Sequence, residues 1–321
     1  MGRVIIGIHG LSNKVSEELL KEWWEMSIYE GLYANFPDDN HKIRFEMVYW
    51  ADLFYKKPLD PAITNKKNHL YVDEAYIPSP KTFAPIESPI RRKIYDIIDN
   101  NIDDILLNDN LTTNYSYITD KIFNTYFEDL GRYYANKELR NTVRERFAEI
   151  IRKHKRHEIM LLTHSMGTII AYEVLTHLVP DIKINTFVTM GSPLGFPLIK
   201  VRIGTELNMK TKSELILKTP ENVTKHWYNF SDINDKVALD YTLSDDYIAN
   251  SNNVAVNDFL VHNDYISNNV RNPHKSFGYL RTPEFAGVLW TFIEETRNPL
   301  VERIINTFNK ARFLFSKSKK N

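Results

Sequence analysis

Four short segments of this chain carry residues that could perform nucleophilic chemistry. The first, Thr-His-Ser-Met-Gly at 163–167, lies between an apolar run at 159–162 and a second apolar run. A serine between a buried strand and a helix stands on a strained turn, the nucleophile elbow, which presents its hydroxyl and needs small neighbours. Gly167 meets that need, whereas Thr163 replaces the usual glycine. The pattern predicts Ser165 as the nucleophile of an acyl-transfer reaction.

The second segment could supply N–H groups to the oxyanion that forms during acyl transfer. The residue after the nucleophile, Met166, is one expected donor. The other comes from the loop after the first strand, where the chain reads His9-Gly10-Leu11, and Leu11 is the expected donor. Gly10 allows close backbone approach, although by itself His9-Gly10 is more typical of an ordinary tight turn.

The third and fourth segments offer a carboxylate and a histidine. Asp232 and Asp235 both follow the short strand expected at 226–230, and either could hold a histidine and stabilise its imidazolium form. His274 lies in a loop before the last strongly helical segment and could act as general base. His262 is its rival, because it also follows a possible strand. From these residues alone, both choices stay open.

Strands and helices alternate along the regions that hold these residues. Apolar runs predict strands at 4–8, 45–50, 158–163, 184–190, 226–230 and 254–260, and helical spacing predicts helices at 15–32, 139–151, 167–178 and 283–296. Such alternation indicates a mostly parallel sheet with helices on both faces and an active site beyond the carboxyl ends of the strands. In the first helix we expect Leu19, Trp23 and Met26 to share one apolar face.

The stretch from residue 53 to 136 interrupts this alternation. Its first part carries prolines that prevent long regular elements, and its second part has helically spaced isoleucines between Ile90 and Ile105. We expect a single domain over residues 1–321, with 53–136 as a largely helical insertion, a lid or cap over one end of the sheet. The alternatives are a surface excursion without a role and a surface that binds another protein.

Composition argues against several classes of function. The 41 basic and 41 acidic residues balance, so no excess of charge points to nucleic acid. Without cysteine the chain can form no disulfide, thiol nucleophile or cysteine–zinc site, and its histidines match no metal motif. No leader-like segment and no apolar stretch long enough to span a bilayer is visible, which favours a cytoplasmic protein.

The last segment, 301–321, has the pattern of a basic amphipathic helix with lysines at its end. Packing of its apolar face on the body is the favoured interpretation. Weak contact with an anionic membrane surface is the alternative. The sequence specifies no oligomeric state.

These motifs resemble the α/β-hydrolase superfamily, and within it lipase-like serine esterases and bacterial hydrolases of unassigned substrate. The resemblance covers about residues 3–50 and 138–296. It is carried by His-Gly at 9–10, Tyr-Trp-Ala-Asp at 49–52, His-Ser-Met-Gly at 164–167, Gly-Ser-Pro-Leu at 191–194, D-x-x-D-x-V at 232–237 and Pro-His-Lys-Ser at 273–276. It implies the α/β-hydrolase fold with the usual first two strands missing, as in compact lipases. It also implies that the second aspartate, Asp235, and the histidine of the Pro-His loop, His274, complete a triad with Ser165.

The activity implied by the resemblance is hydrolysis of a carboxylic ester through a Ser-His-Asp triad and an acyl-enzyme, as in lipases and esterases. The substrate would be a small-molecule or lipid ester, and the chemistry requires no cofactor or metal. A thioesterase, acyltransferase or amidase would use the same residues. From a different class, Thr163 in the elbow leaves room for a non-catalytic binding module on the hydrolase fold.

Overall fold

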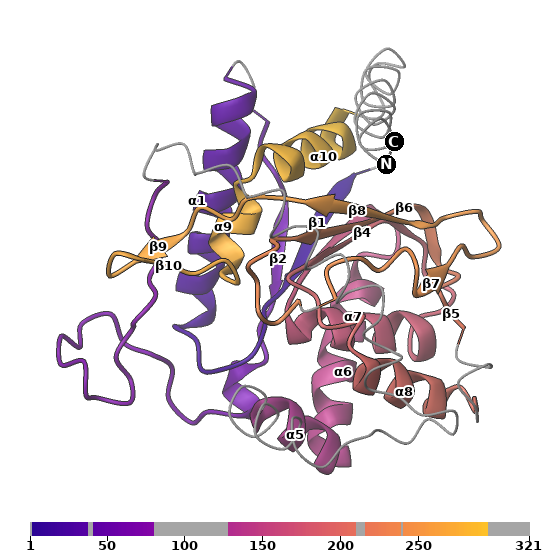
Figure 1. Cartoon of the computed structure of the whole chain (residues 1–321), viewed down its shortest axis with the longest axis horizontal. Helices are drawn as coiled ribbons and strands as arrows, with labels where there is room; N and C mark the ends of the chain where they lie inside the picture. Colours follow the sequence, from indigo (N-terminus) through magenta and orange to yellow (C-terminus); the bar gives the residue numbers. More distant parts are fainter. Residues whose placement is uncertain (1, 38–40, 80–127, 210–215, 239, 295–321) are drawn as a thin grey trace, which may run out of the picture.

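A six-stranded, all-parallel sheet forms the centre of the computed structural model, which describes residues 2–37, 41–79, 128–209, 216–238 and 240–294. The strand order is β2-β1-β3-β4-β6-β8 (Figure 1). These strands are β1 (Arg3–Ile8), β2 (Phe45–Val48), β3 (Glu158–His164), β4 (Ile184–Met190), β6 (Val223–Ser231) and β8 (Val256–Leu260). All six were predicted from the apolar runs, with small differences at their ends. Two short pairs lie outside the sheet: β5 (Leu217–Lys218) with β7 (Tyr247–Ile248), and β9 (Ile266–Ser267) with β10 (Val270–Arg271).

Helices cover both faces of this sheet (Figure 1). One hydrophobic core includes residues of α5 (Glu128–Ala135), α6 (Lys137–Lys153), α7 (Met166–His177) and α8 (Pro197–Glu206). The other includes residues of α1 (Glu17–Asn35), α9 (Ser276–Leu280) and α10 (Pro283–Glu294). A single turn of 3₁₀ helix, η1 (Ala51–Leu53), follows β2. The parallel sheet with helices on both faces is the one that the alternation predicted, and the architecture is that of the α/β-hydrolase fold, as the resemblance implied.

The central strands of the sheet are buried on both faces, which explains the continuous apolar runs in β1 and β3. Every residue of β4 is buried, as is every residue of β3 after Glu158. Along β1, Ile6 and Ile8 belong to the first core, and Ile5 belongs to the second. The polar residues with chemistry therefore gather where these strands end.

The most deeply buried face of helix α1 is adjacent to the stripe expected from the sequence. Its buried residues are Leu20, Trp24, Ser27, Ile28, Gly31 and Leu32. Of the predicted stripe, Leu19 and Trp23 are partly buried and pack against the second core, whereas Met26 is 43% exposed. A Cβ atom on Gly31 would lie 2.8 Å from the Cα atom of Arg281, so the backbone after α9 packs directly on this glycine. The helix has two adjacent apolar stripes, and the one with small residues permits this close approach.

The insertion at 53–136 is described only at its two ends. The helix expected between Ile90 and Ile105 lies outside the described residues, as does the tail at 301–321. At the first end, the carbonyl of Ala75 accepts a hydrogen bond from the Tyr265 hydroxyl at 2.6 Å, and the carbonyl of Asp73 accepts one from Ser267 at 3.0 Å. This stretch therefore packs along the loop that leads to His274. The second end of the insertion is helix α5.

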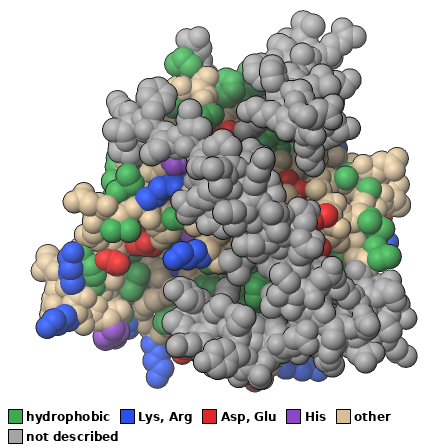
Figure 2. Space-filling view, viewed as in Figure 1, with side chains coloured by type: hydrophobic (Ala, Val, Ile, Leu, Met, Phe, Trp, Pro, Cys, Tyr) green, Lys and Arg blue, Asp and Glu red, His purple; other side chains and the backbone are tan. Residues whose placement is uncertain are grey.

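The edge formed by residues 56–69 is strongly polar. Lys56, Lys57, Lys66 and Lys67 are all exposed there. Basic side chains are visible along the same edge of the molecule in Figure 2. Within the described ranges, no helix has the length and apolar character that a membrane crossing requires.

Candidate active site

Ser165 stands on a sharp turn between β3 and α7. Its φ of 54° and ψ of −130° lie in a region that L-residues rarely adopt. A Cβ atom on Gly167 would lie 2.8 Å from the carbonyl oxygens of Ile8 and His9, so the start of α7 passes too close to the end of β1 for any side chain. The strained serine turn expected from the sequence is therefore confirmed. Strain of this kind persists only where the surrounding structure holds it.

Thr163 fits the elbow although a glycine is usual at its position. Its side chain is fully buried, and its hydroxyl donates a hydrogen bond to the carbonyl of Val188 in β4 at 2.7 Å. A buried hydroxyl costs little once it has such an acceptor. The neighbouring strand thus supplies the acceptor that lets a threonine replace the usual glycine.

Three predicted site residues meet in one chain of hydrogen bonds. His274 lies in the loop between β10 and α9, and its Nε2 is 3.0 Å from the Oγ of Ser165. Its Nδ1 is 2.8 Å from Oδ2 of Asp235, which lies in the turn after β6. With Nδ1 protonated, the ring donates to the carboxylate and leaves Nε2 to accept the serine proton. The side chain of His274 is 24% exposed, so the ring borders the solvent side of the site.

The carboxylate of Asp235 is buried yet favours its charged form. Burial by itself raises the pKa of this group. The neighbouring His274, the Tyr279 hydroxyl and the N–H of Val237 all favour the carboxylate, and together they lower the pKa below its usual value. Asp235 is therefore ionised at neutral pH and can stabilise an imidazolium at His274.

Gly191 makes room for the contact between the aspartate and the histidine. Its φ is +53°, and a Cβ atom there would lie 2.7 Å from Oδ2 of Asp235 and 3.0 Å from Nδ1 of His274. Only glycine accommodates both this backbone conformation and these neighbours. The sequence showed Gly191 as part of a Gly-Ser-Pro-Leu motif, but not what it contacts.

Tyr279 and His164 also hold the site, and neither role could be read from the sequence. The hydroxyl of Tyr279 donates to Oδ2 of Asp235 at 2.7 Å and accepts the N–H of Asp232 at 3.0 Å. Burial lowers the pKa of His164 well below its usual value, so the ring is neutral and its Nε2 donates to the carbonyl of His274 at 2.7 Å. Tyr279 and Asp235 lie 44 positions apart, and His164 and His274 lie 110 positions apart. Local sequence motifs do not extend over such distances.

Replacing Tyr279 with phenylalanine should lower both stability and activity. The buried N–H of Asp232 loses its acceptor, and we expect a loss of about 1–3 kcal/mol in the free energy of unfolding. The lost hydrogen bond to Asp235, about 1 kcal/mol, should lower kcat roughly fivefold. Urea denaturation and steady-state kinetics measure the two effects. Tyr33→Phe, at an exposed position, serves as control. Wild-type behaviour of Tyr279→Phe in both assays would contradict the assigned contacts.

The side chains of the two alternates from the sequence, Asp232 and His262, both contact Arg271. Oδ2 of Asp232 accepts the N–H of Asn263 at 2.7 Å and also binds the guanidinium of Arg271. Nη2 of Arg271 is 3.0 Å from Nδ1 of His262. Asn263 in turn donates from Nδ2 to the carbonyl of Lys275, at 2.8 Å. This network supports the loop that carries His274 and does not contact Ser165.

The two expected oxyanion donors flank the serine. Met166 is the first residue of α7, so its N–H has no acceptor within the helix. A Cβ atom on Gly10 would lie 2.6 Å from Cβ of Ser165, which brings the loop with Leu11 against the nucleophile. His9 holds this loop, because its Nδ1 donates to the carbonyl of Gly10 at 2.8 Å and its Nε2 accepts the N–H of Trp50 at 3.1 Å.

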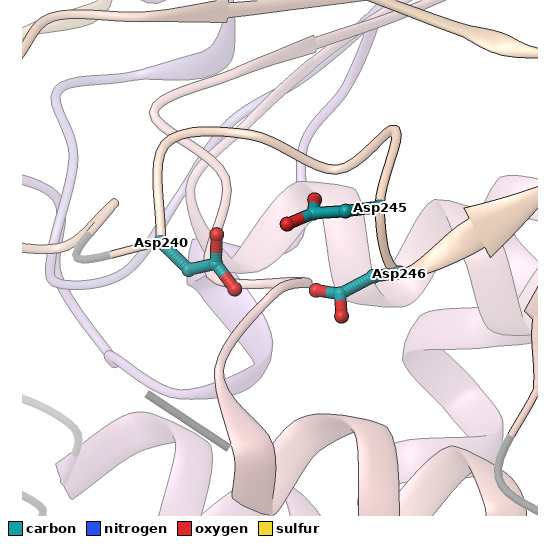
Figure 3. A group of neighbouring side chains, drawn as sticks. All are labelled: Asp240, Asp245 and Asp246. Atoms are coloured by element: carbon teal, nitrogen blue, oxygen red, sulfur yellow. The ribbon is translucent and has the colours of Figure 1, made fainter. Parts of the chain in front are cut away.

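Three aspartates form an acidic group away from these residues. Oxygen atoms of Asp240, Asp245 and Asp246 lie within 4.8 Å of one another in the segment between β6 and β7 (Figure 3). The ammonium of Lys200, on α8, is almost fully buried and donates to Asp246. A lysine thus balances part of this charge, and the group makes no hydrogen bond with Ser165, Asp235 or His274.

Comparison with known proteins identifies one family. The model of the PGAP1-like alpha/beta domain matches residues 108–280, more than half of the 321-residue chain. The matched range contains Ser165, Asp235 and His274, whereas the loop at 9–11 lies before it. No curated protein and no solved structure matches the chain.

Proposed function

Because this chain belongs to the PGAP1-like α/β domain family, an α/β-hydrolase-like family with serine esterase and lipase members, we propose that it is a serine hydrolase that cleaves a carboxylic ester. The observation that carries the proposal is the hydrogen-bonded series Ser165–His274–Asp235, with the serine on a strained turn. A series in this order activates a hydroxyl for attack on a carbonyl carbon.

The proposed reaction passes through an acyl-enzyme. Nε2 of His274 takes the proton of Ser165 as its Oγ attacks the carbonyl, and Asp235 stabilises the resulting imidazolium. The N–H groups of Met166 and Leu11 stabilise the oxyanion of the tetrahedral intermediate. His274 then gives its proton to the departing alcohol. A water molecule, activated by the same ring, attacks the acyl group and releases the acid.

The proposed substrate is a small-molecule or lipid ester. PGAP1, whose domain gives the family its name, is a lipid-remodelling esterase, which favours a lipid ester for this chain. Thioesters and amides would use the same groups, but no contact of the described residues favours them. A non-catalytic binding module would have no need of the strain at Ser165 or of an ionised Asp235 buried behind His274.

A fluorophosphonate probe tests the proposal, because it labels only activated serines. We expect labelling of the wild-type protein at neutral pH and none of Ser165→Ala. Ser192→Ala is the matched control: Ser192 is also buried after a strand, but its hydroxyl pairs with Thr168 at 2.9 Å and with the N–H of Leu194 at 3.2 Å. This variant should label like the wild type. Persistent labelling of Ser165→Ala, or no labelling of the wild type, would refute the proposal.

A further inference from the structure

A buried carboxylate from the insertion reaches the loop that holds Leu11. Asp129 is the second residue of α5 and is 4% exposed. Its Oδ2 accepts the N–H of Ser12 at 2.7 Å, across 117 positions of sequence. The hydroxyl of Tyr55 donates to the same carboxylate, at 2.8 Å and 2.9 Å from its two oxygens. A buried charge requires such donors, so this carboxylate is committed to the loop and to the first end of the insertion.

The peptide unit between Leu11 and Ser12 is held at both ends. Asp129 binds its N–H, and the ammonium of Lys14 donates to its carbonyl, that of Leu11. Lys14 also donates to the carbonyl of Ser12, at 2.9 Å. Ser12 has a φ of +71°, a strained value for a residue with a side chain, and it needs contacts of this kind to persist.

The preceding peptide unit is held as well. The Nδ1 of His9 binds the carbonyl of Gly10. Because the N–H and C=O groups of a trans peptide point in opposite directions, this bond turns the N–H of Leu11 to the other side of the chain. Two peptide planes flank Leu11. His9 holds the one before it, and Asp129 and Lys14 hold the one after it.

The charges in this region support the same arrangement. Burial and the ammonium of Lys275 lower the pKa of Lys14 to about 7, whereas the charges of Asp129 and Glu74 act in the opposite direction. Asp129 therefore helps to keep Lys14 in the ammonium form that binds the carbonyl of Leu11. Loss of the Asp129 charge would weaken two contacts of the peptide unit between Leu11 and Ser12: the one to the N–H of Ser12 and the one from Lys14 to the carbonyl of Leu11.

We propose that Asp129 is a positioning residue for the oxyanion hole, which holds the Leu11 N–H in place through the N–H of Ser12. The inference rests on the proposed function of the site. It gives the insertion at 53–136 a part in the reaction, because Asp129 lies at one end of this segment.

The test compares Asp129→Leu, Asp129→Asn and Tyr55→Phe in the full chain. With p-nitrophenyl butyrate as the probe, Asp129→Leu should lower kcat about 30- to 100-fold, somewhat less than the loss of an oxyanion donor itself, with KM within about twofold. Asp129→Asn should fall between it and the wild type, because its amide oxygen still accepts the N–H of Ser12. Tyr55→Phe removes a different hydrogen bond of the carboxylate, which also pairs with Arg132 at 3.5 Å, and should stay within about twofold of the wild type.

A transition-state analogue separates positioning from general damage. A trifluoromethyl ketone adds to the serine and forms an oxyanion, so its inhibition constant should rise in parallel with the loss of kcat/KM in the Asp129 variants. If Asp129→Leu does not fold, the graded effect of Asp129→Asn on kcat and on the inhibition constant carries the test. Wild-type kcat in the Asp129 variants, or an equal loss in Tyr55→Phe, would overturn the proposal. Failure of the proposed function would be seen separately, as no fluorophosphonate labelling that depends on Ser165.

Discussion

Asp235→Asn should lower kcat for ester hydrolysis by about 10³- to 10⁴-fold. The carboxylate accepts a hydrogen bond from Nδ1 of His274 and is held in its ionised form. An asparagine at this position can turn its NH₂ group toward the ring, which favours the tautomer with the proton on Nε2. That tautomer cannot take the proton of Ser165, and no charge remains to stabilise an imidazolium. The side chains have nearly the same shape, so the fold should persist.

Asp232→Asn is the matched comparison, because Asp232 lies in the same turn and is equally buried. It binds Arg271 and the N–H of Asn263 instead of the ring of His274. We expect a loss of stability of about 3–5 kcal/mol, typical of breaking a buried ion pair, with a much smaller effect on kcat. Steady-state kinetics and urea denaturation of both variants measure these effects. The assignment would be wrong if Asp232→Asn lost more activity than Asp235→Asn.

Gly191→Ala should lower kcat about 100-fold or more, although it adds a single methyl group. That group would lie 2.7 Å from Oδ2 of Asp235 and 3.0 Å from Nδ1 of His274, at the place where the two side chains meet. One of them must move, and a displacement near 1 Å in a catalytic group costs about 10²-fold in rate. The φ of +53° also becomes unfavourable for alanine, which should lower the free energy of unfolding by about 1–3 kcal/mol.

Gly131→Ala is the control for the same substitution. Among the residues that the structure describes, a Cβ atom at Gly131 would meet no atom within 4 Å beyond its chain neighbours and its own helix, α5. Alanine should leave kcat unchanged there and stabilise the helix by about 0.5–1 kcal/mol. Kinetics and thermal unfolding of the two variants give the comparison. Full activity of Gly191→Ala would show that the aspartate and the histidine do not depend on this close contact.

The alternation of strands and helices could be predicted because it depends on short-range patterns. A strand buried on both faces is typically apolar over several consecutive residues, as β1 and β3 are. Ser165 could be singled out for the same reason. A strand, a serine, a glycine two positions later and an apolar helix are all adjacent in the chain. The most deeply buried stripe of α1 could not be predicted, because the helix offers two adjacent apolar stripes and the backbone after α9 packs on the one that contains Gly31.

The choice among the acid and base candidates shows where local information ends. Asp232 and Asp235 differ by three positions in one turn, and both are buried. What separates them is the direction of each side chain, and that depends on Arg271 for one and His274 for the other. A family resemblance favoured Asp235, but composition and spacing did not.

The sequence by itself thus determined the order of the elements, the strained serine and the small set of residues that could assist it. Only the tertiary structure brought Asp235 into contact with His274 and placed Gly191 next to that contact. It also brought Asp129 to the loop that holds Leu11. The physical reason is that these contacts join residues between 39 and 117 positions apart. Their geometry depends on how strand ends and loops pack together, which no local run of residues encodes.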